Sequence, residues 1–276
     1  MKELNLNEIQ KHALGCMIYF DKICRKYNLK YTLGYGSLIG AVRHKGFIPW
    51  DDDLDVLMLR EDYEKLKKVF LNNEEVHDKY KFLCYENNKE YYYTIGRMVD
   101  TETKIEFTNG CKNVEEMGVF IDIYPLDYIV NNKYKIYLIS FLMDFIIRGL
   151  FINNTNFSSI KGKTILHEYI KKYILKNIYS FIGNKRLFLL YKILFNSLKN
   201  ETENLTCLWN GNLIKKIKYP KKYFTNMKEI DFNNKRFFIT EDYDDLLKIS
   251  YKNYMKLPPI EDRKPQHSYR AYLRGE

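Results

Sequence analysis

The sequence has few of the features that mark exported or disulfide-stabilised proteins. Its 276 residues include only five cysteines: Cys16, Cys24, Cys84, Cys111 and Cys207. They are odd in number, widely spaced and free of CxxC pairs, which predicts neither a disulfide framework nor a zinc site. The N-terminal segment carries acids and amides where a signal peptide would have its apolar run. We therefore expect reduced, mostly buried thiols and a cytoplasmic location.

Repeats and low-complexity linkers are also absent from the sequence. The apolar segment Ile136 to Ile152 is short for a membrane span and contains Asp144 and Arg148, which favours a buried or interfacial helix. With 46% hydrophobic residues, a chain of this length can bury a sizeable core. The sequence therefore predicts a globular protein.

Acidic residues are scarce in one region. Residues 161–222 contain 14 Lys and Arg against three acids, whereas the chain as a whole has a net charge of +10. Such a region suits anionic lipid headgroups, a phosphate-rich polymer or nucleic acid, and an ordinary solvated helix surface is the alternative. We find no RNA-binding motif and no basic patch interleaved with aromatic residues, which argues against nucleic acid.

Hydrophobic periodicity predicts three parts. Residues 1–130 form a mixed α/β core, 131–222 a helical, lysine-rich annex, and 223–276 a strand, a helix and an irregular tail that return to the core. The helix of the last part is expected to begin after Thr240 as its cap. Expected helices lie at 6–27, from 37 and at 60–70, and expected strands at 30–36, 53–59, 80–86, 91–100, 103–107, 118–127 and 235–240.

An unusual cluster of acids lies at the entrance to the predicted strand 53–59. Four carboxylates follow Trp50 directly: Asp51, Asp52, Asp53 and Asp55. Carboxylates this close repel one another and are costly to desolvate, so we expect a positively charged partner. Strand alternation places Asp53 and Asp55 on one face, and Asp122, flanked by apolar residues, is the natural third carboxylate. Such hard oxygen ligands suit Mg²⁺ or Mn²⁺.

A solvated acidic turn or a calcium loop is the alternative for this cluster. An EF-hand is excluded, because the sixth position counted from Asp51 is Val56 rather than Gly, and the twelfth is Asp62 rather than Glu. A solvated turn would leave Asp122 unexplained. The pattern therefore favours a metal site.

A Gly-Ser turn precedes the acids. Gly36 and Ser37 open a predicted helix, where backbone N–H groups, a hydroxyl and the helix dipole favour a phosphate group. Together with the three acids, this turn resembles the nucleotidyltransferase-fold superfamily, whose members hold phosphate on such a turn and divalent metal on three carboxylates.

Three longer blocks sharpen the resemblance to one family. Residues 31–66 (YTLGYGSLIGAVRHKGFIPWDDDLDVLMLREDYEKL), 118–127 (GVFIDIYPLD) and 237–259, with Gln266-His267 beyond them, are similar in order to the LicD/fukutin family of phosphotransferases. The resemblance implies an α/β (α+β) fold with a mixed sheet flanked by helices. It also implies metal binding and catalysis by Asp53, Asp55 and Asp122, with Asp51 as a fourth ligand or a supporting group. Two positions depart from the pattern: Phe232 to Asn234 replaces Phe-Glu-Gly, and Tyr251-Lys252 replaces Tyr-Gly.

The activity that this resemblance implies is metal-dependent phosphoryl transfer. Bacterial members of the family move phosphocholine from CDP-choline to a cell-surface glycan, such as lipopolysaccharide or a teichoic-acid precursor, and CMP leaves. Asp122 would help to deprotonate the acceptor hydroxyl. We expect the aromatic faces of Trp50 and Tyr91 to Tyr93 around the quaternary ammonium. Cations expected near the diphosphate are Arg43, His44, Lys45, Arg97, Arg263 and His267.

Two other functions remain open. The same fold could serve a nucleotidyltransferase that acts on RNA or a small molecule, for which the basic middle region would be suited. A non-catalytic module that binds a divalent metal or a sugar is the alternative from a different class. For the leading function, the annex is expected to contact the acceptor or, peripherally, an anionic membrane.

Overall fold

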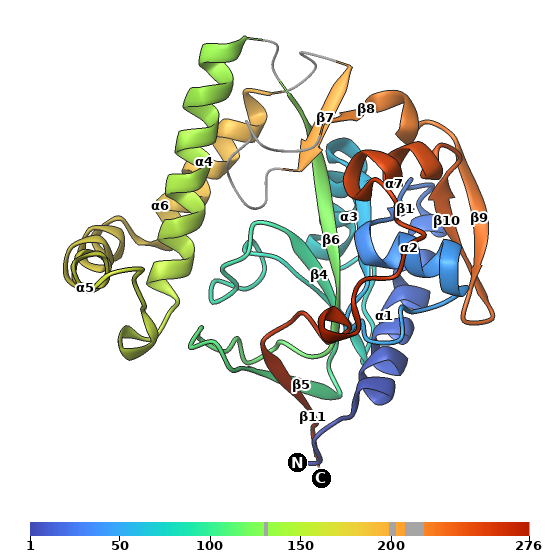
Figure 1. Ribbon diagram of the computed structural model, residues 1–276, viewed down its shortest axis with the longest axis horizontal. Helices are drawn as coiled ribbons and strands as arrows, with labels where there is room; N and C mark the ends of the chain where they lie inside the picture. The colour runs from blue at the N-terminus through green and yellow to red at the C-terminus, as the bar shows by residue number, and fades with distance from the viewer. Residues whose placement is uncertain (130–131, 199–202, 208–217, 276) are drawn as a thin grey trace.

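A mixed β-sheet forms the centre of the computed structural model, which describes residues 1–129, 132–198, 203–207 and 218–275 (Figure 1). The strand order is β1-β2-β6-β4-β3, and β7 pairs with the far end of β6 and with β8. Strand β2 runs parallel to β6, and the other pairs are antiparallel. The predicted α/β class is therefore confirmed. The strands of this sheet are β1 (Thr32–Leu33), β2 (Asp55–Leu59), β3 (Tyr80–Leu83), β4 (Gly96–Asp100), β6 (Phe120–Tyr128), β7 (Asn204–Cys207) and β8 (Tyr219–Pro220).

Three helices of the first half pack against this sheet, as the sequence predicts. Helix α1 (Leu6–Lys26) begins with a capping box, in which the Asn5 side chain accepts from the Glu8 N–H and the Glu8 carboxylate accepts from the Asn5 N–H. Its apolar stripe faces β4 and β6. Helix α2 (Tyr35–His44) contacts β2, and α3 (Arg60–Leu71) contacts β2 and β6. All five cysteines are free thiols and all but Cys111 are buried, as expected.

The predicted annex is largely helical. It contains α4 (Lys133–Asn153), α5 (Ile165–Tyr169), a π-helical segment at Ile170–Leu175 and α6 (Lys176–Asn196), which lie to one side of the sheet in Figure 1. Helices α4 and α6 share an apolar cluster separate from the main core. Strands β7 and β8 also fall within 131–222, yet they join the main sheet. Of the lysines counted in the basic region, Lys199, Lys215 and Lys216 lie outside the described residues.

Helix α4 is the apolar segment noted in the sequence. By length and composition it could cross a membrane, and 33% of its most apolar window is buried inside the protein. The buried residues Ile139, Met143, Ile146 and Leu150 recur every three or four positions, so a single stripe of α4 packs inward. Four other apolar side chains near the start of the helix are exposed: Tyr134, Tyr137, Leu138 and Phe141.

A β-hairpin follows the annex, formed by β9 (Met227–Phe232) and β10 (Lys235–Thr240). Its two turn residues, Asn233 and Asn234, have φ angles of 46° and 61°, in the left-handed region that Asn tolerates. Lys252 also has a positive φ, 55°, at the end of α7 (Tyr243–Tyr251). At both departures, the residue that stands where the family pattern has glycine, Asn234 or Lys252, has a positive φ, which glycine adopts most readily.

Two predictions for the C-terminal part are wrong. Thr240 does not cap α7: the helix begins at Tyr243, and the Thr240 hydroxyl instead donates to the carbonyl of Tyr223 and accepts from the N–H of Asp242. The tail is not irregular throughout, because β11 (Tyr269–Leu273) pairs with β5 (Thr103–Phe107). No local signal reveals this pairing, since the partner lies more than 160 residues earlier. Short 3₁₀ turns lie at Phe157–Ser159, Lys221–Phe224 and Ile260–Asp262.

Candidate active site

Three aspartates meet where β2 and β6 run side by side. Asp55 is the first residue of β2, and the parallel register places it opposite Asp122 on β6. Asp53 precedes β2 in an irregular segment, so strand alternation does not orient it as predicted. Its carboxylate nevertheless joins the other two: one oxygen from each of the three residues lies within 4.8 Å of the others. All three side chains are buried.

The protein itself balances the charge of this cluster only in part. Burial raises the pKa of Asp55 well above its ordinary value, and the charges of Asp53 and Asp122 raise it further. Burial also raises the pKa of Asp53 to about 8, although the charge of His267 opposes the shift. Asp55 Oδ1 is buried without a hydrogen-bond partner among the described residues. A buried carboxylate oxygen with no donor fits an oxygen-liganded divalent cation.

Asp122 is held by two neighbours. Its Oδ1 accepts from Arg97 Nε at 2.5 Å, and its Oδ2 accepts from the Tyr124 hydroxyl at 3.1 Å. Arg97 is itself buried, with its guanidinium carbon 4.1 Å from the ring centroid of Tyr93 and 3.9 Å from that of Phe120. The guanidinium that the sequence places at the donor diphosphate is therefore bound to a carboxylate of the cluster.

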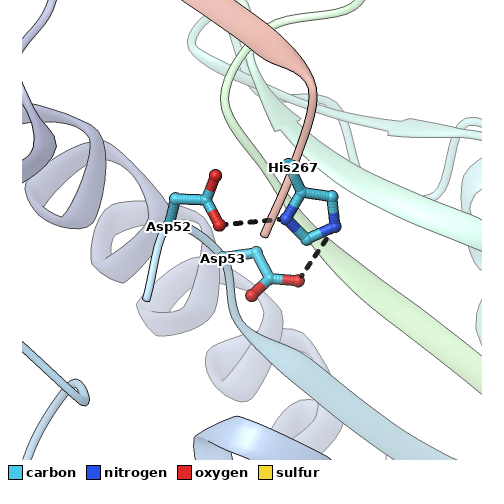
Figure 2. Close-up of side chains that lie close together, drawn as sticks. All are labelled: Asp52, Asp53 and His267. Atoms are coloured by element: carbon cyan, nitrogen blue, oxygen red, sulfur yellow. Dashed lines mark hydrogen bonds and ion pairs between the residues drawn. The ribbon is translucent and has the colours of Figure 1, made fainter. Parts of the chain in front are cut away.

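A histidine from the C-terminal tail contacts the acidic segment. Figure 2 shows the ring of His267 between Asp52 and Asp53, with its Nδ1 3.0 Å from Asp52 Oδ1 and its Nε2 3.6 Å from Asp53 Oδ2. Burial lowers the pKa of His267, but the hydrogen bond with Asp52 and the charge of Asp53 outweigh this and raise it to about 9. At neutral pH the ring is an imidazolium that neutralises part of the acidic segment. Sequence reasoning gave Asp52 no role, because its partner lies 215 residues away.

The start of α2 lies against the same acids. Ser37 is buried, and its Oγ accepts from the Asp55 N–H at 2.7 Å, so this hydroxyl positions the first residue of β2. A Cβ on Gly36 would lie 2.6 Å from Asp51 Oδ2. The absence of a side chain at Gly36 therefore allows α2 to approach the acidic segment closely. Burial and the charge of Asp52 raise the pKa of Asp51 to about 6.

Trp50 lies at the centre of a second group of predicted residues. The ring centroid of His44 is 6.5 Å from that of Trp50, and the guanidinium carbon of Arg263 is 5.5 Å from the Trp50 ring centroid. Arg43 Nε donates to His44 Nε2 at 2.9 Å, and burial lowers the pKa of both side chains. Lys45 follows the last residue of α2 and is exposed, and no described side-chain contact joins it to this group. Of the predicted aromatic residues, Tyr91 and Tyr92 are fully buried, whereas Tyr93 packs on Arg97.

Comparison with known proteins identifies the class to which this site belongs. Residues 28–135, which contain the three aspartates, match the family model described as LicD/FKTN/FKRP, nucleotidyltransferase domain. The chain is also 32% identical over 278 residues to the lipopolysaccharide cholinephosphotransferase LicD of Haemophilus influenzae, covering 99% of this chain and 100% of that protein. The chain therefore belongs to the LicD family, as its sequence motifs predict.

Two shorter matches fall on proteins without a described activity. An uncharacterized protein of Rickettsia typhi is 31% identical over 134 residues, which cover 48% of this chain and 37% of that protein. An uncharacterized protein of Rickettsia prowazekii is 42% identical over 68 residues, covering 25% of this chain and 23% of that protein.

Proposed function

We propose that this chain is a metal-dependent transferase that moves phosphocholine, or a related phospho-alcohol, from a CDP-activated donor to a hydroxyl of a cell-surface glycan. The observation that carries this proposal is the buried cluster of Asp53, Asp55 and Asp122, with one carboxylate oxygen left without a donor. Similarity over nearly the full length to an enzyme named for cholinephosphate transfer to lipopolysaccharide supports the transferred group and the class of acceptor. A teichoic-acid precursor belongs to the same class of acceptor.

Asp53, Asp55 and Asp122 would hold Mg²⁺ or Mn²⁺, with Asp51 beside them. When bound, such an ion neutralises charge on the donor diphosphate and on the leaving phosphate oxygen. The raised pKa values of Asp53 and Asp55 support this role, because a cation replaces the protons that the crowded carboxylates otherwise bind.

Asp122 is the residue that we assign to the acceptor. Its bonds to Arg97 and Tyr124 fix the direction of the carboxylate, which would accept the proton of the acceptor hydroxyl. The acceptor oxygen then bonds to the phosphorus that carries choline. The bond from that phosphorus to the bridging oxygen breaks, and its electron pair leaves with CMP.

The start of α2 and the residues around Trp50 are our candidates for donor binding. Gly36 lies in the first turn of α2, where the helix dipole favours an anion such as a phosphate group. Arg43 and Arg263 bring two cations to this side of the acids. Trp50 already faces one cation, Arg263, so its ring also suits the quaternary ammonium of choline.

The annex is our candidate for a peripheral contact with an anionic membrane on the cytoplasmic side. More than half of the exposed large apolar side chains of the described residues lie between 133 and 198, for example Tyr134, Phe141, Ile165 and Phe181. Basic residues outnumber acidic ones in the same segment. Apolar residues interleaved with lysines are typical of surfaces that insert shallowly among anionic headgroups.

Incubation with CDP-choline, Mg²⁺ and lipopolysaccharide tests the proposed function. We expect CMP release that depends on the metal and on Asp55, measured by chromatography, with choline incorporated into the glycan. Release of phosphocholine with transfer of the cytidylyl group would instead identify a nucleotidyltransferase. Metal binding without turnover of any nucleotide would identify a non-catalytic module.

A further inference from the structure

A cavity lies between the core and α6, away from the carboxylates. Its volume is about 240 Å³, far more than the roughly 10–15 Å³ that a single water molecule needs. Helix α3, the residues that follow β3, the residues that precede β4 and helix α6 together line it. We refer to it as the α3–α6 pocket.

The side chains of this pocket combine cations and aromatic rings. Five cations and one acid line it: Arg60, Lys67, Lys89, Lys185, Lys192 and Glu86. The ring of Tyr85, from the core, stacks on that of Phe188, from α6, with centroids 3.7 Å apart and planes 10° apart. This stack connects the two walls and presents apolar ring surface to the cavity.

Two of the cations are already neutralised within the protein. Arg60 Nε and Nη2 each bond a different oxygen of Asp127, at 2.8 and 2.7 Å, and Arg60 also pairs with Glu64. Lys67 Nζ lies 2.8 Å from carboxylate oxygens of both Glu64 and Glu86. Their charges are therefore unavailable to a ligand.

Three cations remain without an acidic partner among the described residues. Lys89 Nζ donates only to the carbonyls of Tyr85 and Glu86, at 2.9 and 3.0 Å, which leaves one of its three donors for a ligand. Lys185 and Lys192, seven residues apart, occupy the same face of α6, and neither has a described hydrogen bond or ion pair. Three ammonium groups around one cavity match a phosphate dianion better than a single carboxylate.

The donor diphosphate cannot supply this anion. Asp127 lies on β6 five residues beyond Asp122, roughly 16 Å along the sheet at about 3.3 Å per residue. Its partner Arg60 directly follows β2, five residues beyond Asp55. The reacting phosphorus must sit at the carboxylates, and the second donor phosphate is only one bridging oxygen away from it. The pocket ligand is therefore a different phosphate group.

Tyr93 connects the pocket with the active site. It lines the cavity, and its ring contacts Arg97, which binds Asp122. We propose that the α3–α6 pocket binds a phosphate-bearing sugar of the acceptor glycan, some distance along the chain from the sugar that receives the transferred group. This assignment rests on the proposed function, because that function makes the acceptor a glycan. The lysines would bind the phosphate, and the Tyr85–Phe188 stack would pack against the sugar ring.

Direct binding to the full chain tests the site without turnover. We expect calorimetry to detect binding of glucose 6-phosphate. Glucose, which lacks the phosphate, and inorganic phosphate, which lacks the sugar ring, should each bind at least tenfold more weakly. The double variant Lys185→Gln and Lys192→Gln should weaken glucose 6-phosphate binding at least tenfold. The matched control, Lys161→Gln and Lys163→Gln, removes the same charge from the annex outside the pocket and should change the affinity less than twofold. No binding to the wild type, or equal losses in both double variants, would overturn the site.

Kinetics then distinguish the acceptor from a free sugar phosphate. Glucose 6-phosphate should raise the KM for lipopolysaccharide and leave kcat and the KM for CDP-choline unchanged. A lowered kcat with an unchanged KM for lipopolysaccharide would show a site independent of the acceptor and would overturn this assignment. If the chain transfers nothing, the proposed function fails, whereas the calorimetric result still decides whether the pocket binds phosphorylated sugars.

Discussion

Asp55→Asn separates metal binding from folding. In the metal-free protein, burial and the neighbouring carboxylates raise the pKa of Asp55 well above its ordinary value, so a negative charge on this side chain is unfavourable there. An amide of the same shape removes this unfavourable charge. We expect the metal-free variant to be as stable as the wild type to within about 1 kcal/mol, which corresponds to roughly 2–4 °C in Tm for a chain of this size.

The response to metal should differ strongly between the two proteins. A ligand at about 100 times its Kd stabilises the folded state by about 2.7 kcal/mol, which corresponds to an increase in Tm of roughly 5–11 °C. The wild type should show this shift when Mg²⁺ or Mn²⁺ replaces EDTA in a thermal melt. Asp55→Asn should show a shift below about 2 °C, because a neutral amide replaces one of the three charged ligands.

Asp78→Asn is the matched control. This exposed aspartate lies in a loop before β3, and its carboxylate has no described ion pair, so the variant should shift with metal as the wild type does. An equal metal shift in Asp55→Asn and the wild type would refute the assignment of Asp55 as a ligand. A metal-free Asp55→Asn protein that is several kcal/mol less stable would refute the view that a negative charge on Asp55 is unfavourable there.

Three further predictions concern the acids, the helix start and the annex. Because burial raises the pKa of Asp53 to about 8, the metal-free folded chain keeps a proton that the unfolded chain releases near pH 4. Urea unfolding should therefore show that the free energy of unfolding of the wild type, relative to that of Asp53→Asn, falls from about pH 4 to about pH 8. A relative stability that rises over this range would contradict the prediction. Gly36→Val should weaken CDP-choline affinity at least tenfold in calorimetry, since its Cβ would meet Asp51; an unchanged affinity with a lowered Tm would limit Gly36 to a structural role. Binding to vesicles with anionic lipid should fall steeply between about 0.1 and 1 M salt, as the screening length shortens from about 10 to about 3 Å, and no binding at low salt would exclude the membrane contact.

The elements around the carboxylates could be predicted because their signals are local. The apolar residues on both sides of Asp122 indicate a buried strand, and the charged segment after β2 has the periodicity of α3. Family motifs in the same segments then identify the three acids as a set. Asp53 is the exception in detail, because it lies before β2 rather than in it, although its carboxylate still reaches the cluster.

Features that depend on distant parts of the chain could not be predicted. The contact between His267 and Asp52 joins residues 215 positions apart, and β11 pairs with β5, more than 160 residues earlier. The burial of Arg97 against Asp122 depends on the register of β4 with β6, which no single segment encodes. The α3–α6 pocket likewise depends on how α6 packs on the core. From the sequence, Lys185 and Lys192 are therefore only two of the many cations of the basic region.

The fate of the choline-bearing phosphorus tests the central claim most directly. CDP-choline labelled at that phosphorus should be incubated with the chain, Mg²⁺ and lipopolysaccharide, and the label followed into the glycan and the released nucleotide. Attack at that phosphorus predicts that the label enters the glycan and that the released CMP is unlabelled. Label recovered in free phosphocholine, with the cytidylyl group on the acceptor, would contradict the account.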